Sequence, residues 1–374
     1  MELLDIQKRA YVEIDLNALE DNYNSFKKPV CAVVKADAYG HGSVALSKFL
    51  EEKGASYFAV SNIEEALELR RSGIKASILI LGYTATSAAA ILASNNIEQC
   101  VYSYEYGCEL NEYAKKESVE VKIHLKIDTG MGRLGFQVHG EHCELEEAYK
   151  TCTLSNLVPV GIFTHFASAD EGINDYTKMQ YDEFVKSINY LNDKGIKFKV
   201  RHCANSAAIL DYKEYYLDMV RAGIALYGIN PSPYEHKLKN VLTFKSLVAH
   251  VKMIKKGDYV SYGRTYLATK DTKVATIPVG YADGIMRSSS GFYVMINSKK
   301  CRIIGRVCMD QIMVECEDAN VGDEVIIYGD GVDISECAKY NNTIAYTLLC
   351  AISRRAVRVY KYNGKIVSIR DDLL

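Results

Sequence analysis

Short apolar runs alternate with amphipathic stretches along residues 30–230, and small or polar residues follow each run. The runs are rich in β-branched and aromatic residues, as is typical of buried strands. The eight runs are Val30–Val34, Tyr57–Val60, Ser77–Leu81, Gln99–Tyr102, Val121–Ile127, Pro159–Phe163, Phe198–Arg201 and Met219–Ala222. The stretches between them have helical spacing, as after the capping pattern Ser61-x-x-Glu64. Eight strand–helix units predict a (β/α)8 barrel, although a doubly wound sheet gives a similar pattern.

The pattern changes at the linker Asn230-Pro231-Ser232-Pro233, after which alternating segments are joined by polar turns. The strands expected there are Ser246–Ile254, Lys273–Val279, Phe292–Ile296, Cys301–Val307, Gln311–Glu315, Glu324–Tyr328, Val357–Tyr362 and Lys365–Ile369. One stretch, Asp333–Ile352, has helical spacing, and Tyr11–Asp15 alternates like a strand. We therefore expect a barrel domain over residues 1–235 and a mainly β domain over 236–374. The first 14 or so residues are candidates to pair with the second domain.

Composition narrows the classes of function. The net charge of −2 over 374 residues is too close to zero to attract nucleic acid or an anionic membrane electrostatically. No apolar run approaches the roughly 18 residues of a membrane span, and the start of the chain lacks a signal-peptide pattern. Eleven cysteines without a CxxC pair favour reduced thiols in the cytoplasm, and no metal site is expected.

If the barrel is correct, chemistry belongs at the carboxyl ends of its strands, where the βα loops meet. Lys35 ends the first strand, where a partly desolvated amine can form a Schiff base with a carbonyl. The alternative is a lysine whose amine reaches solvent. The fifth strand runs into Lys126–Gly135, in which glycines allow close approach and Arg133 offers a fork for a carboxylate. This loop has neither Walker A nor GxGxxG spacing, so it does not indicate a nucleotide site.

The last three strands add a candidate proton-transfer group and a candidate phosphate site. His165, after the sixth strand, could tune a neighbouring acid or base, although a lone histidine is more often structural. Ser206, Gly223 and Ile224 follow the last two strands, where barrels often bind phosphate. A Schiff-base lysine facing a phosphate site indicates a phosphorylated aldehyde, which describes pyridoxal phosphate.

The run Val33–Gly42 resembles the cofactor-attachment motif of the alanine racemase family, and the resemblance covers nearly the whole chain. Further motifs occur in family order: Lys126–Gly135, Thr164–Ala167, Ala204–Ala208, Val220–Gly228, Val260–Gly263, Gly280–Gly284 and Gly305–Asp310. The resemblance implies an isomerase that interconverts L- and D-alanine with pyridoxal phosphate, and D-alanine serves peptidoglycan synthesis.

The resemblance also implies two catalytic bases on opposite faces of the α-carbon. Lys35 would hold the cofactor and act as one base, and Tyr262 would be the other. Tyr262 would come from the partner subunit of a head-to-tail homodimer. Arg221 would contact the pyridine nitrogen and keep it unprotonated, and His165 would couple Tyr262 to Arg221.

The remaining site residues follow from the same resemblance. Arg133 would contact the substrate carboxylate or the cofactor's phenolic oxygen, supported by Lys126, which some members carry as a carbamate. The residues that would bind the phosphate are Tyr39, Ser206, Gly223 and Ile224. Those that would close the substrate pocket are Met309 and Asp310, and those that would line an access channel are Asp170 and Tyr281.

One position departs from the family pattern. Where the family usually has Ile-Ser-Tyr-Arg, this chain has Ile352-Ser353-Arg354-Arg355, so Arg354 replaces a tyrosine beside the phosphate. Serine, or another small amino acid, is therefore an alternative substrate. A non-catalytic pyridoxal phosphate carrier would lack the second domain, and a class I aldolase would not explain the motifs after residue 240.

Overall fold

The computed structural model describes residues 9–140 and 143–373, and its contacts divide them into two compact units. The barrel unit comprises residues 20–38 and 43–238. The β-rich unit comprises residues 9–19, 39–42 and 239–373. Residues 1–8, which belong to the segment expected to pair with the second domain, lie outside the described residues.

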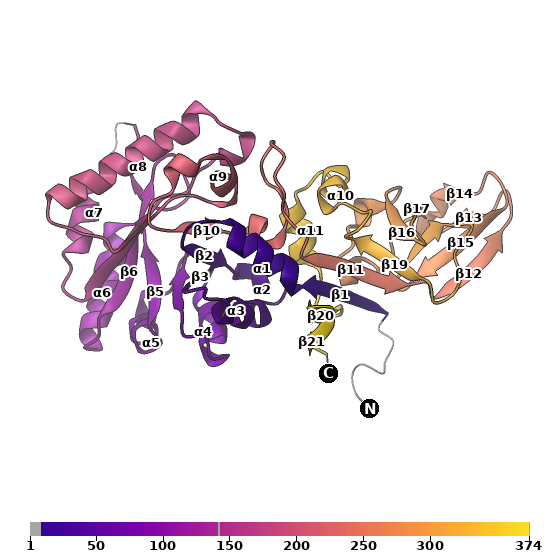
Figure 1. The fold of residues 1–374 in the computed structure, drawn as a ribbon, viewed down its shortest axis with the longest axis horizontal. Coiled ribbons are helices and arrows are strands. Elements are labelled where there is room, and N and C mark those ends of the chain that lie inside the picture. Colours follow the sequence, from indigo (N-terminus) through magenta and orange to yellow (C-terminus); the bar gives the residue numbers. More distant parts are fainter. Residues whose placement is uncertain (1–8, 141–142, 374) are drawn as a thin grey trace. The chain divides into compact units, whose positions relative to one another are not determined.

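Parallel strands form the sheet of the barrel unit, in the order β10-β2-β3-β4-β5-β6-β8-β9. Figure 1 labels β2, β3, β5, β6 and β10 of this sheet. The strands are β2 (Val30–Val33), β3 (Tyr57–Val60), β4 (Ser77–Ile80), β5 (Ile97–Val101), β6 (Val121–Asp128), β8 (Leu157–Phe163), β9 (Val200–His202) and β10 (Val220–Ala222), and the short β7 (Phe136–Gln137) pairs with β6. The amide of Arg221 donates to the carbonyl of Ala204 at 2.9 Å, which joins the two end strands into a ring. The barrel prediction is confirmed, and its strands are buried at nearly every position because both faces are covered.

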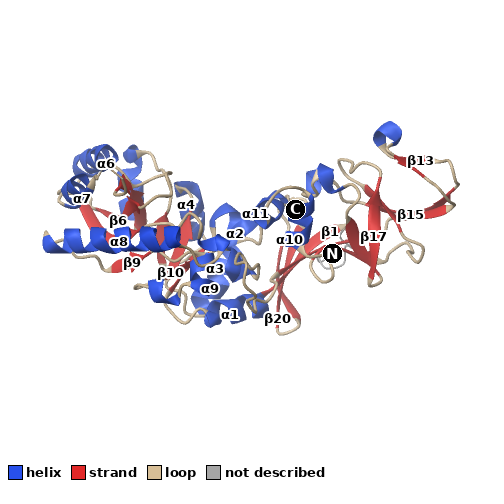
Figure 2. Cartoon of the chain, turned by 90° about the horizontal axis from the view of Figure 1, so that it is seen from above, coloured by secondary structure: helices blue, strands red, loops and turns tan. Residues whose placement is uncertain are grey.

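Helices cover the outside of this sheet, and Figure 2 shows α6, α7 and α8 beside β6 and β9. They are α1 (Leu16–Ser25), α3 (Ser43–Glu52), α4 (Ile63–Arg71), α5 (Ala89–Ser94), α6 (Tyr104–Lys116), α7 (Leu145–Cys152), α8 (Asp175–Asp193) and α9 (Ser206–Asp211). The cap of α4 lies one residue later than predicted. The Asn62 side chain accepts from the Glu65 amide, and the Glu65 carboxylate accepts from the Ser61 amide.

The β-rich unit contains a ten-stranded sheet in the order β12-β15-β18-β17-β16-β19-β11-β1-β20-β21. Its strands are β1 (Ala10–Asp15), β11 (Leu242–Leu247), β12 (His250–Ile254), β15 (Thr272–Ile277), β16 (Tyr293–Ile296), β17 (Lys299–Ile304), β18 (Ile312–Glu315), β19 (Glu324–Tyr328), β20 (Val357–Tyr362) and β21 (Lys365–Arg370). The first strand, β1, lies antiparallel to β11 and parallel to β20, with Val12 opposite Phe244 and Arg358. Buried and half-buried positions alternate along β1 and β11, as expected where one face of a sheet covers a core.

Two predicted elements of this unit are wrong in extent. The expected strand Ser246–Ile254 is two strands, because β11 pairs with β1 and β19 whereas β12 pairs with β15. The chain changes partner where the Ala249 amide donates to the Thr276 carbonyl. The expected helix Asp333–Ile352 is likewise two helices, α10 (Ile334–Tyr340) and α11 (Ala345–Ala351), because Asn342 between them has a φ of +53°.

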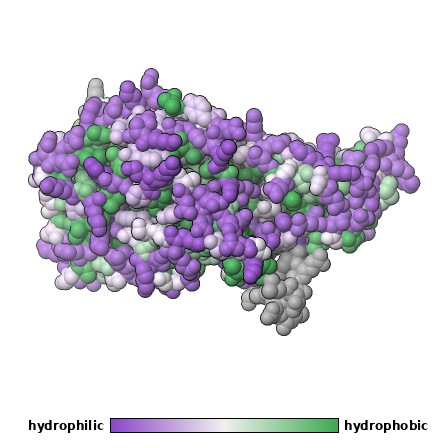
Figure 3. Space-filling model, in the orientation of Figure 1, coloured by the Kyte–Doolittle hydropathy of each residue, from purple (hydrophilic) through white to green (hydrophobic). Residues whose placement is uncertain are grey.

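No helix in the described part of the chain is long and apolar enough to cross a membrane. On the face drawn in Figure 3, hydrophilic residues predominate and hydrophobic residues occur in scattered small groups.

Candidate active site

Lys35 follows β2 directly and begins a left-handed turn, labelled α2 (Lys35–Tyr39). Residues 36–39 all have φ between +52° and +55°, a conformation that costs L-residues about 1–2 kcal/mol each. Local hydrogen bonds hold the turn: the Ala36 amide donates to the Glu65 carboxylate at 2.7 Å, and the Asp37 carboxylate accepts from the Ser43 amide at 2.8 Å. Lys35 is thereby fixed at the carboxyl end of its strand, where barrel enzymes place their chemistry.

The loop after β6 is organised around the Asp128 carboxylate. That group accepts hydrogen bonds from the amides of residues 130–133, at 2.8 to 3.2 Å. Gly135 has a φ of +129°, and a Cβ there would lie 2.7 Å from the Asp128 nitrogen, so the loop closes only with glycine. Arg133, at the end of this turn, is exposed.

Lys126, on β6, is buried inside the barrel. Its Nζ donates to the Ile127 carbonyl at 3.0 Å and lies 5.2 Å from the centroid of the Phe163 ring. Burial, with a further contribution from the Arg221 charge, lowers the pKa of the Lys126 amine from 10.5 to about 7. The side chain is therefore partly neutral at physiological pH.

Arg221, on β10, is buried and held in one orientation by acceptors of the barrel interior. Its Nη2 donates to the carbonyls of Thr164 and Cys203 at 2.8 and 3.1 Å, and its Nη1 reaches Nδ1 of His202 at 2.8 Å. Burial lowers the pKa of Arg221 to about 10, so the guanidinium stays charged at neutral pH. Nδ1 of His165 lies 3.3 Å from Nη2, and desolvation together with the Arg221 charge holds the pKa of His165 well below its usual value. The structure thus brings together a permanent cation and a neutral imidazole.

The loops after β9 and β10 meet at Ser206. Its Oγ accepts from the amide of Gly223 at 2.9 Å and from the amide of Ala225 at 3.3 Å. Asn205 caps α9 by accepting from the Ala208 amide. These loops present a hydroxyl and backbone amides, which is a donor set suited to phosphate oxygens.

A second cluster lies in the β-rich unit, around Tyr262. The residue sits between β13 (Tyr259–Val260) and β14 (Tyr266–Leu267), a hairpin that the sequence did not predict. Ser261 before it has a φ of +68° and donates its hydroxyl to the Arg306 carbonyl at 2.8 Å. Gly305 permits this approach, because a Cβ there would lie 2.6 Å from Cβ of Ser261. Tyr262 itself is 71% exposed.

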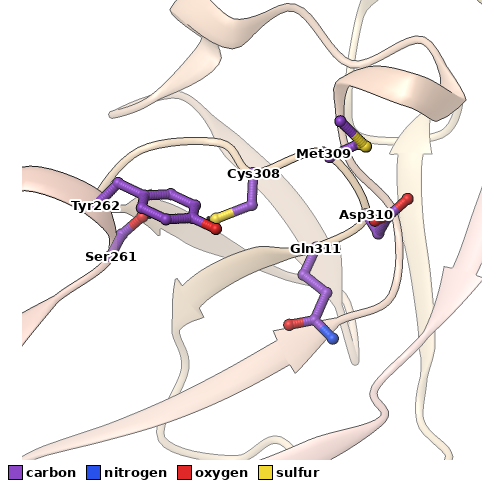
Figure 4. Close-up of a pocket in the computed structure, with 6 residues that line it drawn as sticks. All are labelled: Ser261, Tyr262, Cys308, Met309, Asp310 and Gln311. Carbon is purple, nitrogen blue, oxygen red and sulfur yellow. Dashed lines mark hydrogen bonds between the residues drawn. The ribbon is translucent and has the colours of Figure 1, made fainter.

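An open cavity of about 420 Å³ adjoins Tyr262. Figure 4 shows the residues that line it: Ser261, Tyr262, Cys308, Met309, Asp310 and Gln311. The loop of Met309 is anchored by amides, since Tyr281 donates to the Cys308 carbonyl and Ala282 donates to the Met309 carbonyl, both at 3.0 Å. The predicted base Tyr262 and the predicted pocket pair Met309 and Asp310 therefore line one pocket, and the amide of Tyr281 holds the loop that carries the pair.

Two other predicted residues lie apart from these contacts. Tyr39 is buried in the β-rich unit, with its ring centroid 5.8 Å from that of Tyr346. Asp170 is exposed on a turn after β8. His202, by contrast, contacts Arg221 directly and received no role from the sequence, although it stands at the end of a predicted strand run.

Comparison with known proteins identifies the family. The profile "Alanine racemase, N-terminal domain" matches residues 14–231, and "Alanine racemase, C-terminal domain" matches residues 241–360. The alanine racemase of Clostridium tetani is 44% identical, over 96% of this chain and 97% of its own length. The chain belongs to the alanine racemase family.

Solved alanine racemase structures have the same fold. That of Clostridium difficile 630 superimposes with a TM-score of 0.94 at 41% identity, covering 99% of this chain and 100% of that one. That of Bartonella henselae, with covalently bound pyridoxal phosphate, has a TM-score of 0.87 at 28% identity, covering 95% of this chain and 100% of that one. The predicted family, isomerase class and cofactor are therefore confirmed.

The residues of the barrel unit fit the family's cofactor. Lys35 offers an amine for the aldehyde. The Ser206 oxygen accepts from the amides of Gly223 and Ala225, which leaves its own O–H, together with the Ile224 amide, to donate to the phosphate. The guanidinium of Arg221, which can only donate, suits the lone pair of an aromatic ring nitrogen. These three groups all lie on loops or strand ends of one parallel barrel.

Proposed function

We propose that this protein interconverts L- and D-alanine by a two-base mechanism that uses Lys35 and Tyr262. The observation that carries the proposal is the Tyr262 pocket, because a carrier or an aldolase has no need of it. Tyr262 is held by a strained, hydrogen-bonded loop, yet its side chain is 71% exposed beside Met309 and Asp310. A phenol placed in this way is available to a substrate rather than committed to packing.

The two bases act on opposite faces of the substrate's α-carbon. When bound, pyridoxal phosphate withdraws electrons and so acidifies the α-proton of the amino acid joined to it. Lys35 would hold the cofactor's aldehyde through its amine, and in its free form that amine would take or return the proton on one face. Tyr262 takes or returns the proton on the other face. A planar carbon reprotonated from the face opposite to the one that lost its proton is inverted.

Arg221 and His165 would control the protonation of the cofactor's ring nitrogen and of the Tyr262 phenol. The charged Arg221 would donate to the ring nitrogen and keep that nitrogen unprotonated, which limits side reactions. His165 would couple Tyr262 to Arg221, and its low pKa supports a neutral, accepting imidazole. Arg133 would bind the substrate carboxylate or the cofactor's phenolic oxygen. Lys126 would support Arg133, and its pKa near 7 provides the neutral amine that a carbamate requires.

The other proposed contacts concern binding and access. Tyr39, Ser206 and the amides of Gly223 and Ile224 would hold the phosphate. Met309 and Asp310 would close the substrate pocket, and the 2.8 Å contact between Asp310 and Arg355 supports a fixed position for that loop. The residues proposed to line the access channel are Asp170 and Tyr281, both exposed.

We further propose a head-to-tail homodimer in which each barrel, residues 1–235, receives Tyr262 and Met309 from the partner's domain, residues 236–374. Exposed apolar side chains near Tyr262 support this arrangement. Tyr259, Leu267 and Met309 are about half exposed, and a group of such side chains around one pocket is typical of a surface that another chain covers.

The compartment and the pathway are also part of the proposal. All eleven cysteines have free thiols, which is consistent with a reducing compartment such as the cytoplasm. There the product D-alanine would serve peptidoglycan synthesis.

Replacing Tyr262 by Phe tests the two-base assignment. The variant should keep the visible band of bound cofactor, and borohydride should still fix the cofactor to Lys35. Racemisation of L-alanine should fall by at least about two orders of magnitude, because a positioned general base contributes about 10²–10⁴-fold. Unchanged turnover would remove Tyr262 from the mechanism.

Substrate choice is tested at Arg354, which is exposed in the β-rich unit. We expect alanine to be the preferred substrate. Serine is the alternative, because an enzyme can discriminate between side chains of such similar size by only about 1–3 kcal/mol. The kcat/KM values for both enantiomers of alanine and serine should shift towards alanine in Arg354→Tyr. An unaltered alanine-to-serine ratio would show that this position does not control specificity.

A further inference from the structure

Behind Arg221, a row of hydrogen-bonded polar side chains crosses the barrel interior. Nδ1 of His202 lies 2.8 Å from Nη1 of Arg221, and Nε2 of His202 lies 3.0 Å from Nδ1 of His124. Nε2 of His124 lies 2.8 Å from a carboxylate oxygen of Glu98. The Tyr57 hydroxyl donates to that same oxygen and lies 2.9 Å from Nε2 of His124. Both imidazoles are fully buried and Glu98 is nearly so. Pairs separated by 19, 78 and 26 positions in the sequence thus form one continuous row.

The barrel is shaped to hold the two imidazoles. On β8, Gly161 lies against His124, and a Cβ at Gly161 would be 2.2 Å from Cε1 of that ring. The Phe163 ring stacks on the His202 ring at a centroid distance of 5.0 Å with an interplanar angle of 3°. Neither ring can turn without displacing a neighbouring strand residue, so the row is a built feature rather than a chance contact.

The direction of every hydrogen bond in the row follows from its two ends. A guanidinium has only donors, so Nδ1 of His202 must accept. Burial and the Arg221 charge hold the pKa of His202 well below its usual value, so the ring is neutral and its proton sits on Nε2. That proton is donated to Nδ1 of His124, which leaves Nε2 of His124 as the donor to Glu98. Glu98 accepts at the far end and thereby fixes both tautomers.

Glu98 is suited to this task because it stays ionised. Burial alone would raise its pKa, but hydrogen bonds from His124, Tyr57 and Ser77 outweigh that effect and lower the pKa of the Glu98 carboxyl. A carboxylate at one end and a guanidinium at the other give the row opposite charges at its two ends. With these ends, every hydrogen bond of the row can form only if each one donates in the direction from Arg221 towards Glu98.

We propose that Glu98 is a positioning residue for Arg221, acting through the Nε2–H tautomers of His124 and His202 to keep an acceptor in front of Nη1. This inference rests on the role proposed above for Arg221 at the cofactor's ring nitrogen. Without the carboxylate at residue 98, the Tyr57 hydroxyl still faces Nε2 of His124 but can either donate or accept, so the proton is no longer fixed on Nε2 and His202 can take the Nδ1–H form. Two donors then face each other, and Arg221 loses one of the contacts that fix its plane.

Two substitutions of Glu98 separate hydrogen bonding from charge. Glu98→Gln keeps an oxygen that can accept from His124, whereas Glu98→Ala removes the acceptor. Tyr57→Phe is the matched control, because it removes the hydroxyl that contacts both the carboxylate and Nε2 of His124 and leaves the carboxylate acceptor in place.

The direct measurement is side-chain ¹⁵N NMR of histidine-labelled protein, which distinguishes Nδ1–H, Nε2–H and charged rings. We expect Nε2–H signals for His124 and His202 in the wild type, in Tyr57→Phe and in Glu98→Gln, and loss of the single tautomer in Glu98→Ala. A charged or Nδ1–H His202 in the wild type would overturn the proposal. So would unchanged tautomers in Glu98→Ala.

Activity of the holoenzyme gives the second readout. We expect kcat to fall about tenfold in Glu98→Ala, the scale of one lost ordering hydrogen bond, and to recover to within about threefold of wild type in Glu98→Gln. If Glu98→Gln and Glu98→Ala both bind the cofactor normally but lose kcat to the same extent, the proposal that Glu98 acts through the histidine tautomers is contradicted. The NMR result does not depend on catalysis, so failure of the racemase proposal and failure of this one are distinguishable. If Glu98→Ala does not fold, the wild-type tautomers and the Gln variant still decide the question.

Discussion

Lys126 and Arg221 are both buried cations of the barrel interior, and burial affects them to different degrees. The pKa of Arg221 falls only to about 10, so its charge persists, whereas that of Lys126 falls to about 7. An arginine therefore suits a role that needs a permanent cation, and a lysine suits one that needs a neutral amine.

Lys126 should make stability depend on pH. Between about pH 7 and 10.5 the unfolded chain holds a proton on this amine that the folded protein does not, so the free energy of unfolding rises with pH over that window. Each unit of pKa shift is worth about 1.4 kcal/mol. Urea unfolding from pH 6 to 9 should show wild type gaining stability relative to Lys126→Met as pH rises. Lys122→Met, exposed on the same strand, is the control, and a parallel profile for Lys126→Met would contradict the burial effect.

The residues that the sequence could identify are those whose position alone is informative. Lys35 ends a strand, and Tyr262 lies in a family motif, so both were expected to matter. His124 was missed because a single polar residue within a predicted apolar strand gives no sign of its partners, and Glu98 was missed because it lay outside the predicted strand. The predicted run began at Gln99, one position after Glu98, although β5 starts at Ile97. Only the closed barrel brings their partners together.

Among the elements, the left-handed turn α2 is the least expected. The sequence predicted a small-residue loop after Lys35, and no periodicity indicates four successive residues at positive φ. The reason lies in hydrogen bonds to Glu65, 29 positions away along the chain, and to Ser43, six positions away, which periodicity does not reveal. Similarly, the split of the predicted strand Ser246–Ile254 into β11 and β12 depends on which partner strand is nearby. The hydrophobic period predicts which face of a strand is buried, but it does not predict which strand lies next to it.

The turn gives a prediction for glycine substitution. In an ordinary helix Ala→Gly costs about 1 kcal/mol, but at Ala36 glycine relieves a left-handed conformation that costs an alanine about 1–2 kcal/mol. Ala36→Gly should therefore leave the free energy of unfolding unchanged or slightly raised. Ala90→Gly, in the right-handed helix α5, should lower it by about 1 kcal/mol. Denaturant unfolding of both variants provides the comparison, and an equal loss at Ala36 would contradict the left-handed turn.

For the whole molecule, the two units each hold some of the proposed site residues. The barrel unit holds Lys35, Arg221 and the donors around Ser206, and the β-rich unit holds Tyr262 and its pocket. Sequence alone predicted both units and their order, since hydrophobic period and length suffice for that. Which copy of the chain supplies Tyr262 to which barrel is a property of assembly, and it is the central claim of the two-base, shared-site proposal.

Complementation between two inactive variants tests that claim most directly. Lys35→Ala and Tyr262→Phe should each be inactive alone as homodimers. After co-expression or subunit exchange, half of the dimers are mixed, and each mixed dimer has one site with an intact Lys35 and an intact Tyr262 from the other copy. Racemisation should then recover to about one quarter of wild type. No recovery in verified mixed dimers would show that both bases come from one chain, or that one of them is not a base, and would contradict the account.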